Sequence, residues 1–323
     1  MNNVIKSVSL FFLVILILLS GACTDSDTPA ISNADTPTTP DVIRFKKMAL
    51  YPEGVEYDAN RNSFLVTSLR EGVIGEVKDD GTYNVLAKDP HMVSAIGIRI
   101  DAARDRFLVC NSDPGVSIHT DPKTQGKLAG LAVFQLSTGK LIKYLDLAKG
   151  LEGAHFCNDI ALDKDGTAYI TDSFSPVIYK VDTDYNTSVL LNNKRFVGEG
   201  FNLNGIVVKD DFLIVSKANE GKLFKVPLKN PEKFSQVQID STFKNGDGLL
   251  WTSDGSLIVI ANVETRKVLK LTSTDNWSSA RITGSADTGQ VYATTGVIRD
   301  GQIYVLHAML HVLFNPKTEK HVE

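Results

Sequence analysis

The chain has 323 residues, of which 43% are hydrophobic, a formal net charge of -4 and three cysteines. This length suits one large domain or two ordinary ones. No Lys-rich or Arg-rich run occurs, and the net charge is negative, so the sequence shows no electrostatic footprint for nucleic acid.

The N-terminal segment has the layout of a secretory signal peptide. Lys6 precedes an apolar run over residues 8–19, which is too short to span a bilayer comfortably. The run leads into LLSGAC, which resembles the lipobox of bacterial lipoproteins, although Ser20 departs from the aliphatic residue that is commoner there. We therefore expect a signal peptide over residues 1–22 and a lipid on Cys23 that anchors the protein in the bacterial cell envelope, on the periplasmic face or the outer surface. A plainly secreted protein and an uncleaved anchor are the alternatives.

A tether follows the expected lipidation site. Residues 23–41 are rich in Thr, Pro, Asp and Ser and lack apolar periodicity, which predicts disorder. With Cys23 assigned to lipid, Cys110 and Cys157 remain, near the same end of adjacent repeats. An oxidising compartment allows a disulfide between them, and two buried thiols fit the sequence at least as well.

One sequence motif recurs six times in the rest of the chain. It consists of a polar residue, usually followed by Gly, then an aliphatic run, a turn, and a second run that ends in another polar residue. The turns include DAN, DKDG, KDD, SDG and RDG, which are hairpin signals. Most copies supply two more short runs, so each repeat predicts the four strands of a β-propeller blade. The copies begin at Glu53, Ile96, Asn158, Asn204, Asp247 and Thr295.

The repeats predict an all-β, six-bladed β-propeller over residues 42–323, with four-stranded antiparallel blades. The last repeat has no obvious fourth strand, and residues 42–51 read as a strand without a blade of its own. We expect this N-terminal strand to close the last blade, which removes an open sheet edge.

The polar residues of this repeated motif are expected to share one rim of the propeller, near its axis. Glu53, Asn158, Asn204 and Asp247 open four of the innermost strands, and Ile96 and Thr295 open the other two. Two carboxylates and two amide oxygens suit Ca²⁺. Zn²⁺ would be poorly served, because neither Cys nor His opens an inner strand. The alternative is that these are ordinary turn residues that cap strands. A second polar set ends the second strands: Ser68, Asn111, Asp172, Lys217, Asn262 and His307.

These residues resemble the six-bladed calcium-dependent hydrolase superfamily that contains gluconolactonase/SMP-30, paraoxonase and squid-type diisopropylfluorophosphatase. The most specific motifs are PEGVEYD, CNDIALDKDGTAYITDS, NGIVV and GDGLLW. The resemblance implies a catalytic Ca²⁺ held by Glu53, Asn158, Asn204 and Asp247, as in the phosphotriesterase and paraoxonase branches. It also places His307 where the phosphotriesterase branch carries a histidine. Ile96 is a departure, and neither His119 nor His155 matches the histidine pair of paraoxonases.

The resemblance further implies hydrolysis of lactones or related esters, with Ca²⁺ as a Lewis acid in the central funnel. The nucleophile is either a metal-associated water or Asp247 itself. His307 either orients the substrate or relays a proton, or is simply a hydrogen-bonded residue at the end of a blade. We expect a substrate pocket lined by Asn111, Asp172, Lys217 and Thr295. The alternatives are that Asn111 and Asp172 only cap turns and that Lys217 is a solvated residue of the rim.

The competing hypothesis is a non-catalytic, membrane-tethered propeller that binds a protein or carbohydrate partner and in which any Ca²⁺ is structural. In either case we expect a monomer that contacts the membrane only through its lipid. The insertion over residues 113–130 is polar and contains Gly, so it is a candidate lid.

Overall fold

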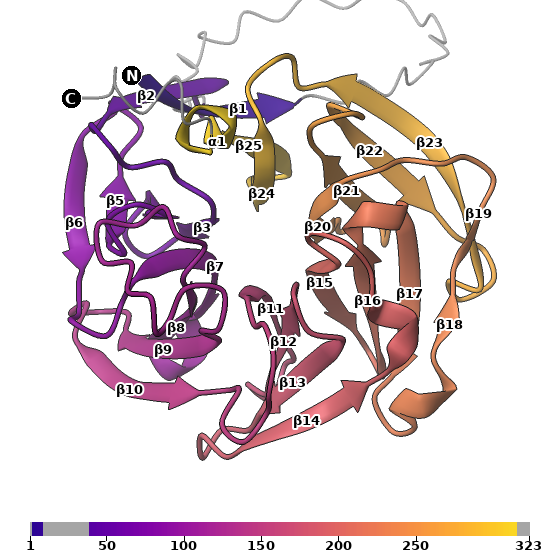
Figure 1. The fold of residues 1–323 in the computed structure, drawn as a ribbon. Coiled ribbons are helices and arrows are strands. Elements are labelled where there is room, and N and C mark those ends of the chain that lie inside the picture. The colour runs from indigo at the N-terminus through magenta and orange to yellow at the C-terminus, as the bar shows by residue number, and fades with distance from the viewer. Residues whose placement is uncertain (1, 9–38, 315–323) are drawn as a thin grey trace, which may run out of the picture.

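The structure is a computed structural model, and it describes residues 2–8 and 39–314. The described strands form six sheets arranged around a central axis (Figure 1). Neighbouring strands of a sheet pair antiparallel, with one exception in the fifth sheet, and five of the sheets have four strands. The prediction of an all-β propeller with four-stranded antiparallel blades is therefore confirmed.

The first three sheets each consist of four consecutive strands. The first sheet holds β3 (Val55–Asp58), β4 (Ser63–Thr67), β5 (Ile74–Val77) and β6 (Tyr83–Ala87). The second holds β7 (Ser94–Asp101), β8 (Arg106–Ser112), β9 (Gly130–Gln135) and β10 (Leu141–Asp146). The third holds β11 (Cys157–Leu162), β12 (Ala168–Asp172), β13 (Val177–Val181) and β14 (Thr187–Asn192).

The next two sheets continue this order. The fourth sheet holds β15 (Leu203–Lys209), β16 (Phe212–Lys217), β17 (Lys222–Pro227) and β18 (Ser235–Gln236). The fifth holds β20 (Gly246–Trp251), β21 (Leu257–Ala261), β22 (Lys267–Thr272) and β23 (Ser279–Asp287). A fifth strand, β19 (Gln238–Ile239), joins this sheet parallel to β23.

The last sheet combines the two ends of the described chain. It holds β24 (Ala293–Arg299) and β25 (Gln302–His307), then β1 (Asn2–Val8) and β2 (Val42–Lys46). The short helix α1 (Leu310–Leu313) follows β25. The predicted closing strand, β2, lies in this sheet, but it differs from the prediction in its neighbour. It pairs with β1, and β1 pairs with β25.

Strand β1 falls inside the predicted signal peptide, so a chain processed at Cys23 would lack it. Cys23 and residues 23–38 lie outside the described residues, and the signal peptide, the lipid and the tether therefore stay predictions. Within residues 2–8 and 39–314, no helix combines the length and the apolar character needed to cross a bilayer.

The core consists of apolar layers between neighbouring sheets. The second strands β4, β8, β12, β16 and β21 are buried along their whole length. Because both faces of such a strand pack against an adjacent blade, its sequence is a continuous apolar run rather than an alternating one. This packing holds the inner strands in a fixed ring, and that ring positions the polar residues at its centre.

Candidate functional site

The polar residues that open the inner strands are released from strand pairing by irregularities in the ladder. Five of the six inner strands show a register shift at or beside the opening residue, for example between Cys157 and Ile160 and between Leu203 and Ile206. In the sixth, β3 begins only at Val55, after the opening pair. A bulge leaves residues unpaired and turns their side chains away from the regular pleat. Asn158 and Asn204 are thereby directed toward the axis.

The glycine after most opening residues is required by the close approach of neighbouring inner strands. A β-carbon at Gly54 would lie 2.5 Å from the carbonyl oxygen of Ile96, and one at Gly205 would lie 2.0 Å from that of Asp247. These distances leave no room for any side chain. Asp159 is the exception, because it takes this position in the third sheet.

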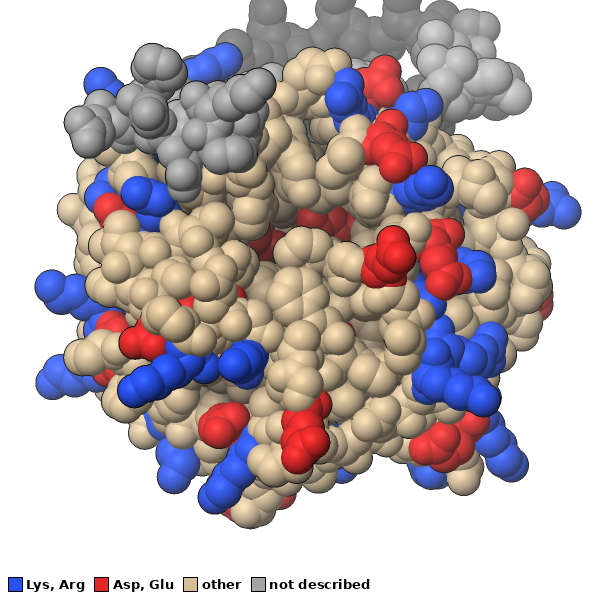
Figure 2. Space-filling model, viewed as in Figure 1, with Lys and Arg blue, Asp and Glu red and all other residues tan. Residues whose placement is uncertain are grey.

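The four predicted ligands lie together at one central cavity of about 260 Å³. Figure 2 shows acidic side chains at the bottom of a hollow in this face of the molecule. The same four residues also line a much smaller void next to this cavity. The structure therefore brings together, from four sheets, Glu53, Asn158, Asn204 and Asp247. We refer to these four residues as the tetrad.

Hydrogen bonds around the tetrad orient its oxygen atoms. Asn158 donates through Nδ2 to Ser173 Oγ at 2.7 Å, and Asn262 donates through Nδ2 to Asp247 Oδ2 at 2.6 Å. The Oδ1 atom of Asn204 is buried and accepts no hydrogen bond from the described residues. A buried amide oxygen without a partner costs free energy unless a ligand satisfies it.

The two carboxylates of the tetrad are electrostatically strained. Burial, followed by the negative charges of Asp247 and Asp159, raises the pKa of Glu53 well above its ordinary range. Burial and then the charge of Asp159 raise the pKa of Asp247 in the same way. Two acids whose ionised forms are disfavoured, beside an unsatisfied amide oxygen, form the donor set that a hard divalent cation would stabilise. The residues present therefore fit Ca²⁺.

Three residues predicted to line the substrate pocket lie elsewhere in the structure. Asn111 donates to the carbonyl of His91 and to Tyr144 Oη, each at 2.8 Å. Lys217 is buried and donates to the backbone carbonyls of Arg195 and Val197, each at 2.9 Å. Both side chains form hydrogen bonds with backbone carbonyls of neighbouring loops, and neither of them lines the cavity.

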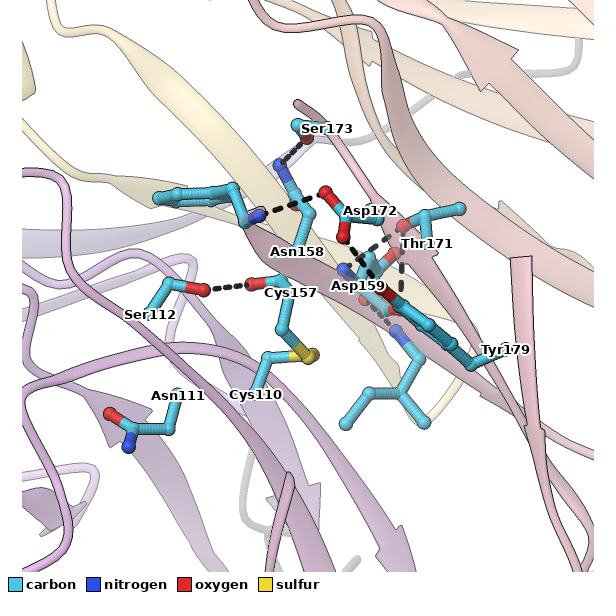
Figure 3. Close-up of a disulfide and its surroundings, with 12 residues drawn as sticks. Cys110, Asn111, Ser112, Cys157, Asn158, Asp159, Thr171, Asp172, Ser173 and Tyr179 are labelled. Carbon is cyan, nitrogen blue, oxygen red and sulfur yellow. Dashed lines mark hydrogen bonds between the residues drawn. A yellow bond between two sulfur atoms is a disulfide. The ribbon is translucent and has the colours of Figure 1, made fainter. Parts of the chain in front are cut away.

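Asp172, the third of these residues, is fully buried and organises the segment before Asn158 (Figure 3). Its carboxylate accepts hydrogen bonds from the Phe156 backbone N–H at 2.8 Å and from Tyr179 Oη at 2.8 Å. His155 Nδ1 lies 2.7 Å from the same carboxylate. Asp172 therefore fixes Phe156, which lines the cavity, without lining it itself.

Thr295 and His307 occupy different surroundings. Thr295 lines the small void beside the tetrad. His307 is 5% exposed at the end of β25 and is not among the residues that line the central cavity. Of the two predicted catalytic residues, only Asp247 faces this cavity.

A disulfide joins Cys110 and Cys157, so the structure decides between the two alternatives left by the sequence (Figure 3). The bond links β8 of the second sheet to β11 of the third, one residue before Asn158. Ser112 Oγ donates to the carbonyl of Cys157 at 2.9 Å and adds a second link between the same strands.

An aromatic wall that the sequence reasoning missed forms one side of the cavity. Phe156, Phe174 and Phe201 pack against one another with ring centroids 5.2 Å apart in each pair. Phe156 and Phe201 line the cavity with Leu310 and Phe314. These residues come from loops and from the end of the described chain, where no periodicity marks them. Only the position of Phe156, two residues before Asn158, was a signal.

The predicted lid is an ordered loop. The buried carboxylate of Asp113 accepts hydrogen bonds from Thr120 Oγ1 at 2.9 Å, from the Asp121 backbone N–H at 3.1 Å and from Thr124 Oγ1 at 2.7 Å. One carboxylate thus holds the turns of this insertion together, and the loop contributes no residue to the cavity lining.

No family model matches the chain, and no curated protein matches it in sequence. Solved structures match it in fold. The major allergen Mala s 1 of Malassezia sympodialis is 17% identical with a TM-score of 0.64, over 82% of this chain and 90% of the allergen. The gluconolactonase XC5397 of Xanthomonas campestris is 14% identical with a TM-score of 0.59, over 80% and 86%. A luciferin-regenerating enzyme is 10% identical with a TM-score of 0.55, over 80% and 92%. At these identities the comparisons establish the propeller fold.

Proposed function

We propose that this chain is a Ca²⁺-dependent hydrolase of lactones or related esters, in which each of the six sheets is one blade and the tetrad holds the ion. The observation that carries the proposal is the donor set at the bottom of the cavity. Two strained carboxylates and the unpartnered Oδ1 of Asn204 meet there. The fold shared with a gluconolactonase and a luciferin-regenerating enzyme is compatible with this chemistry. Fold alone does not decide function, since an allergen shares it as well.

Within this proposal, the residues of the chain divide the work. Bound Ca²⁺ would supply Lewis-acid polarisation of the substrate carbonyl. Asp247 faces the cavity as nucleophile or as the acceptor of a proton from an attacking water, and Asn262 holds one of its carboxylate oxygens in place. Phe156 and Phe201 exclude water from one side of the reacting group.

The cavity lining also favours a class of substrate. Among the described residues that line it, none is Lys or Arg, and Glu53, Glu199 and Asp247 are acidic. An anionic substrate would be repelled by this lining. The aromatic wall instead suits an uncharged lactone or ester with an apolar acyl or aryl group.

We propose the cell envelope as the location, with removal of residues 1–22 and lipid on Cys23. The signal-like N-terminus and the lipobox-like LLSGAC support this proposal.

The proposal is tested on the purified full-length chain with lactones, aryl esters and phosphotriesters, with added Ca²⁺ and with EDTA. We expect Ca²⁺ to raise the melting temperature and EDTA to abolish hydrolysis. Glu53→Gln and Asp247→Asn should lose both effects, whereas Asp182→Asn, in a surface turn of the third sheet, should keep them. If chelation changes neither melting nor turnover, the proposal is wrong. If Ca²⁺ stabilises the fold and no substrate is hydrolysed, the non-catalytic binding propeller replaces it.

A further inference from the structure

A second ring of residues lies three positions beyond the opening residues of the six inner strands. Four of its members are Ala161, Val207, Leu250 and Ile298, and the other two are Glu56 and Arg99. All six line a cavity of about 320 Å³ farther along the inner strands. An ion pair inside an otherwise apolar ring needs a specific reason, because burying charges is costly.

Arg99 connects three inner strands through its guanidinium group. It donates through Nε to the carbonyl of Ile160 at 2.7 Å and through Nη1 to Glu56 Oε1. Its Nη2 atom lies 3.8 Å from Asp159 Oδ2. The side chain of Arg99 is 16% exposed, so this is a largely buried cation between two carboxylates.

Asp159 extends this connection to a fourth inner strand and up to the tetrad. Its Oδ2 atom accepts a hydrogen bond from the Ile206 backbone N–H at 3.2 Å. Its negative charge also contributes to the raised pKa values of Glu53 and Asp247. Asp159 also follows Asn158 directly in the chain and lines the small void shared by the tetrad and Arg99, so it lies between them.

The space between Arg99 and the tetrad is almost filled. The void lined by the tetrad, Asp159 and Arg99 measures about 10 Å³. Such a space holds about one water molecule at most, so it cannot accept a hydrated ion beside the guanidinium. Arg99 also lines the larger cavity beyond, and it thus stands between the two.

We propose that Arg99 is a fixed internal cation that takes the place of a second metal ion in the axial channel. By this name we mean the small void below the tetrad together with the cavity of about 320 Å³ beyond it. Arg99 neutralises Glu56 and Asp159, holds Asp159 as a positioning residue below the tetrad, and limits the chain to one ion. The inference rests on the proposed function, because it assumes that the tetrad binds Ca²⁺. Its distinct content is the number of ions that the channel accepts and the residue that sets this number.

Calcium titration by calorimetry, combined with melting in EDTA and in Ca²⁺, tests the inference. The variants are Arg99→Ala, which removes the guanidinium and opens space, and Arg99→Ala with Glu56→Gln. The matched control is Arg106→Ala. Arg106 is a buried arginine of the adjacent strand β8 that pairs with Asp101 at 2.9 Å away from the axis.

We expect one ion in the wild type and in Arg106→Ala, and two ions in Arg99→Ala. Adding Glu56→Gln should weaken the second ion at least tenfold. Ca²⁺ should restore the melting temperature of Arg99→Ala but not that of Arg106→Ala. A stoichiometry of one in a folded Arg99→Ala protein overturns the inference while the proposed function stands. A wild type that binds no Ca²⁺ overturns both.

The Arg99→Ala protein tests the inference even if it is unstable. Folding of Arg99→Ala only after Ca²⁺ is added, with two ions bound, supports the inference. If this variant folds in neither condition, the wild type and Glu56→Gln decide. A second ion in the wild type that Glu56→Gln removes overturns the inference, and a single ion of unchanged affinity in both proteins supports it.

Discussion

Loss of the disulfide between Cys110 and Cys157 is expected to lower the free energy of unfolding by about 4 kcal/mol. The two cysteines are 47 residues apart in the chain. Closing a loop of that length in the unfolded chain costs about 4 kcal/mol in the chain-entropy model at 25 °C. Single domains are stable by only about 5–15 kcal/mol, so this is a large share of the total. Because the bond links two sheets, the hydrogen bonds within a blade do not replace it.

The measurement is denaturant and thermal unfolding of the oxidised protein, the protein reduced with dithiothreitol, and the Cys110→Ala/Cys157→Ala variant. A loss of 4 kcal/mol corresponds to a fall in melting temperature of about 7 °C for a domain of this size. Reductant should lower the transition of the wild type and leave that of the double variant unchanged. Peptide mapping of the unreduced protein should recover the two cysteines as one linked pair.

Two results would refute this reasoning. One is a difference of less than about 1 kcal/mol between the oxidised and reduced proteins, since the loop-closure cost would then be absent. The other is recovery of Cys110 and Cys157 as free thiols from protein produced in an oxidising compartment.

The other predictions concern loop fastening, the support of β11 and the aromatic wall. Lys217→Met should lower the unfolding free energy by about 2–3 kcal/mol because it removes the buried ammonium that binds two loop carbonyls and Glu220, whereas Lys222→Met at the surface should cost less than about 1 kcal/mol; equal effects in chemical denaturation would contradict this. Asp172→Asn should cost about 3 kcal/mol, against less than about 1 kcal/mol for Asp182→Asn, and similar melting temperatures would argue against the network drawn around Asp172. If the proposed function holds, Phe201→Ala should raise KM for aryl esters about tenfold with little change in kcat, and an unchanged KM would show that the wall does not contact the substrate.

The structure also explains the glycines in the repeated motif. The sequence reveals that five of the six opening residues are followed by Gly. The reason appears only in three dimensions, where the β-carbon of Gly54 or Gly205 would meet the backbone of the next inner strand. The exception, Asp159, was readable from the same alignment of repeats. The same alignment also shows Arg99. It is the cation among the six residues that lie three positions beyond the opening residues, and the other five are apolar or acidic.

The residues that end the second strands were harder to judge from sequence. Asn111, Asp172 and Lys217 lie at the predicted end of their blades, as expected from their register. Their side chains, however, turn to neighbouring loops, where each of them binds a backbone group. Register predicts where a strand ends along the blade, but it does not predict which nearby group a long polar side chain will bind.

The sequence by itself determined the propeller fold and the four residues of the tetrad, because both depend on a pattern repeated in register along one chain. The tertiary structure decided what depends on contacts between segments far apart in the sequence. These include the disulfide between two sheets, the aromatic wall contributed by loops, and the ion pair of Arg99 with Glu56 between neighbouring inner strands. A period along the chain records the repeating strands, whereas these particular contacts occur once and follow no period, and only the packed ring brings them together.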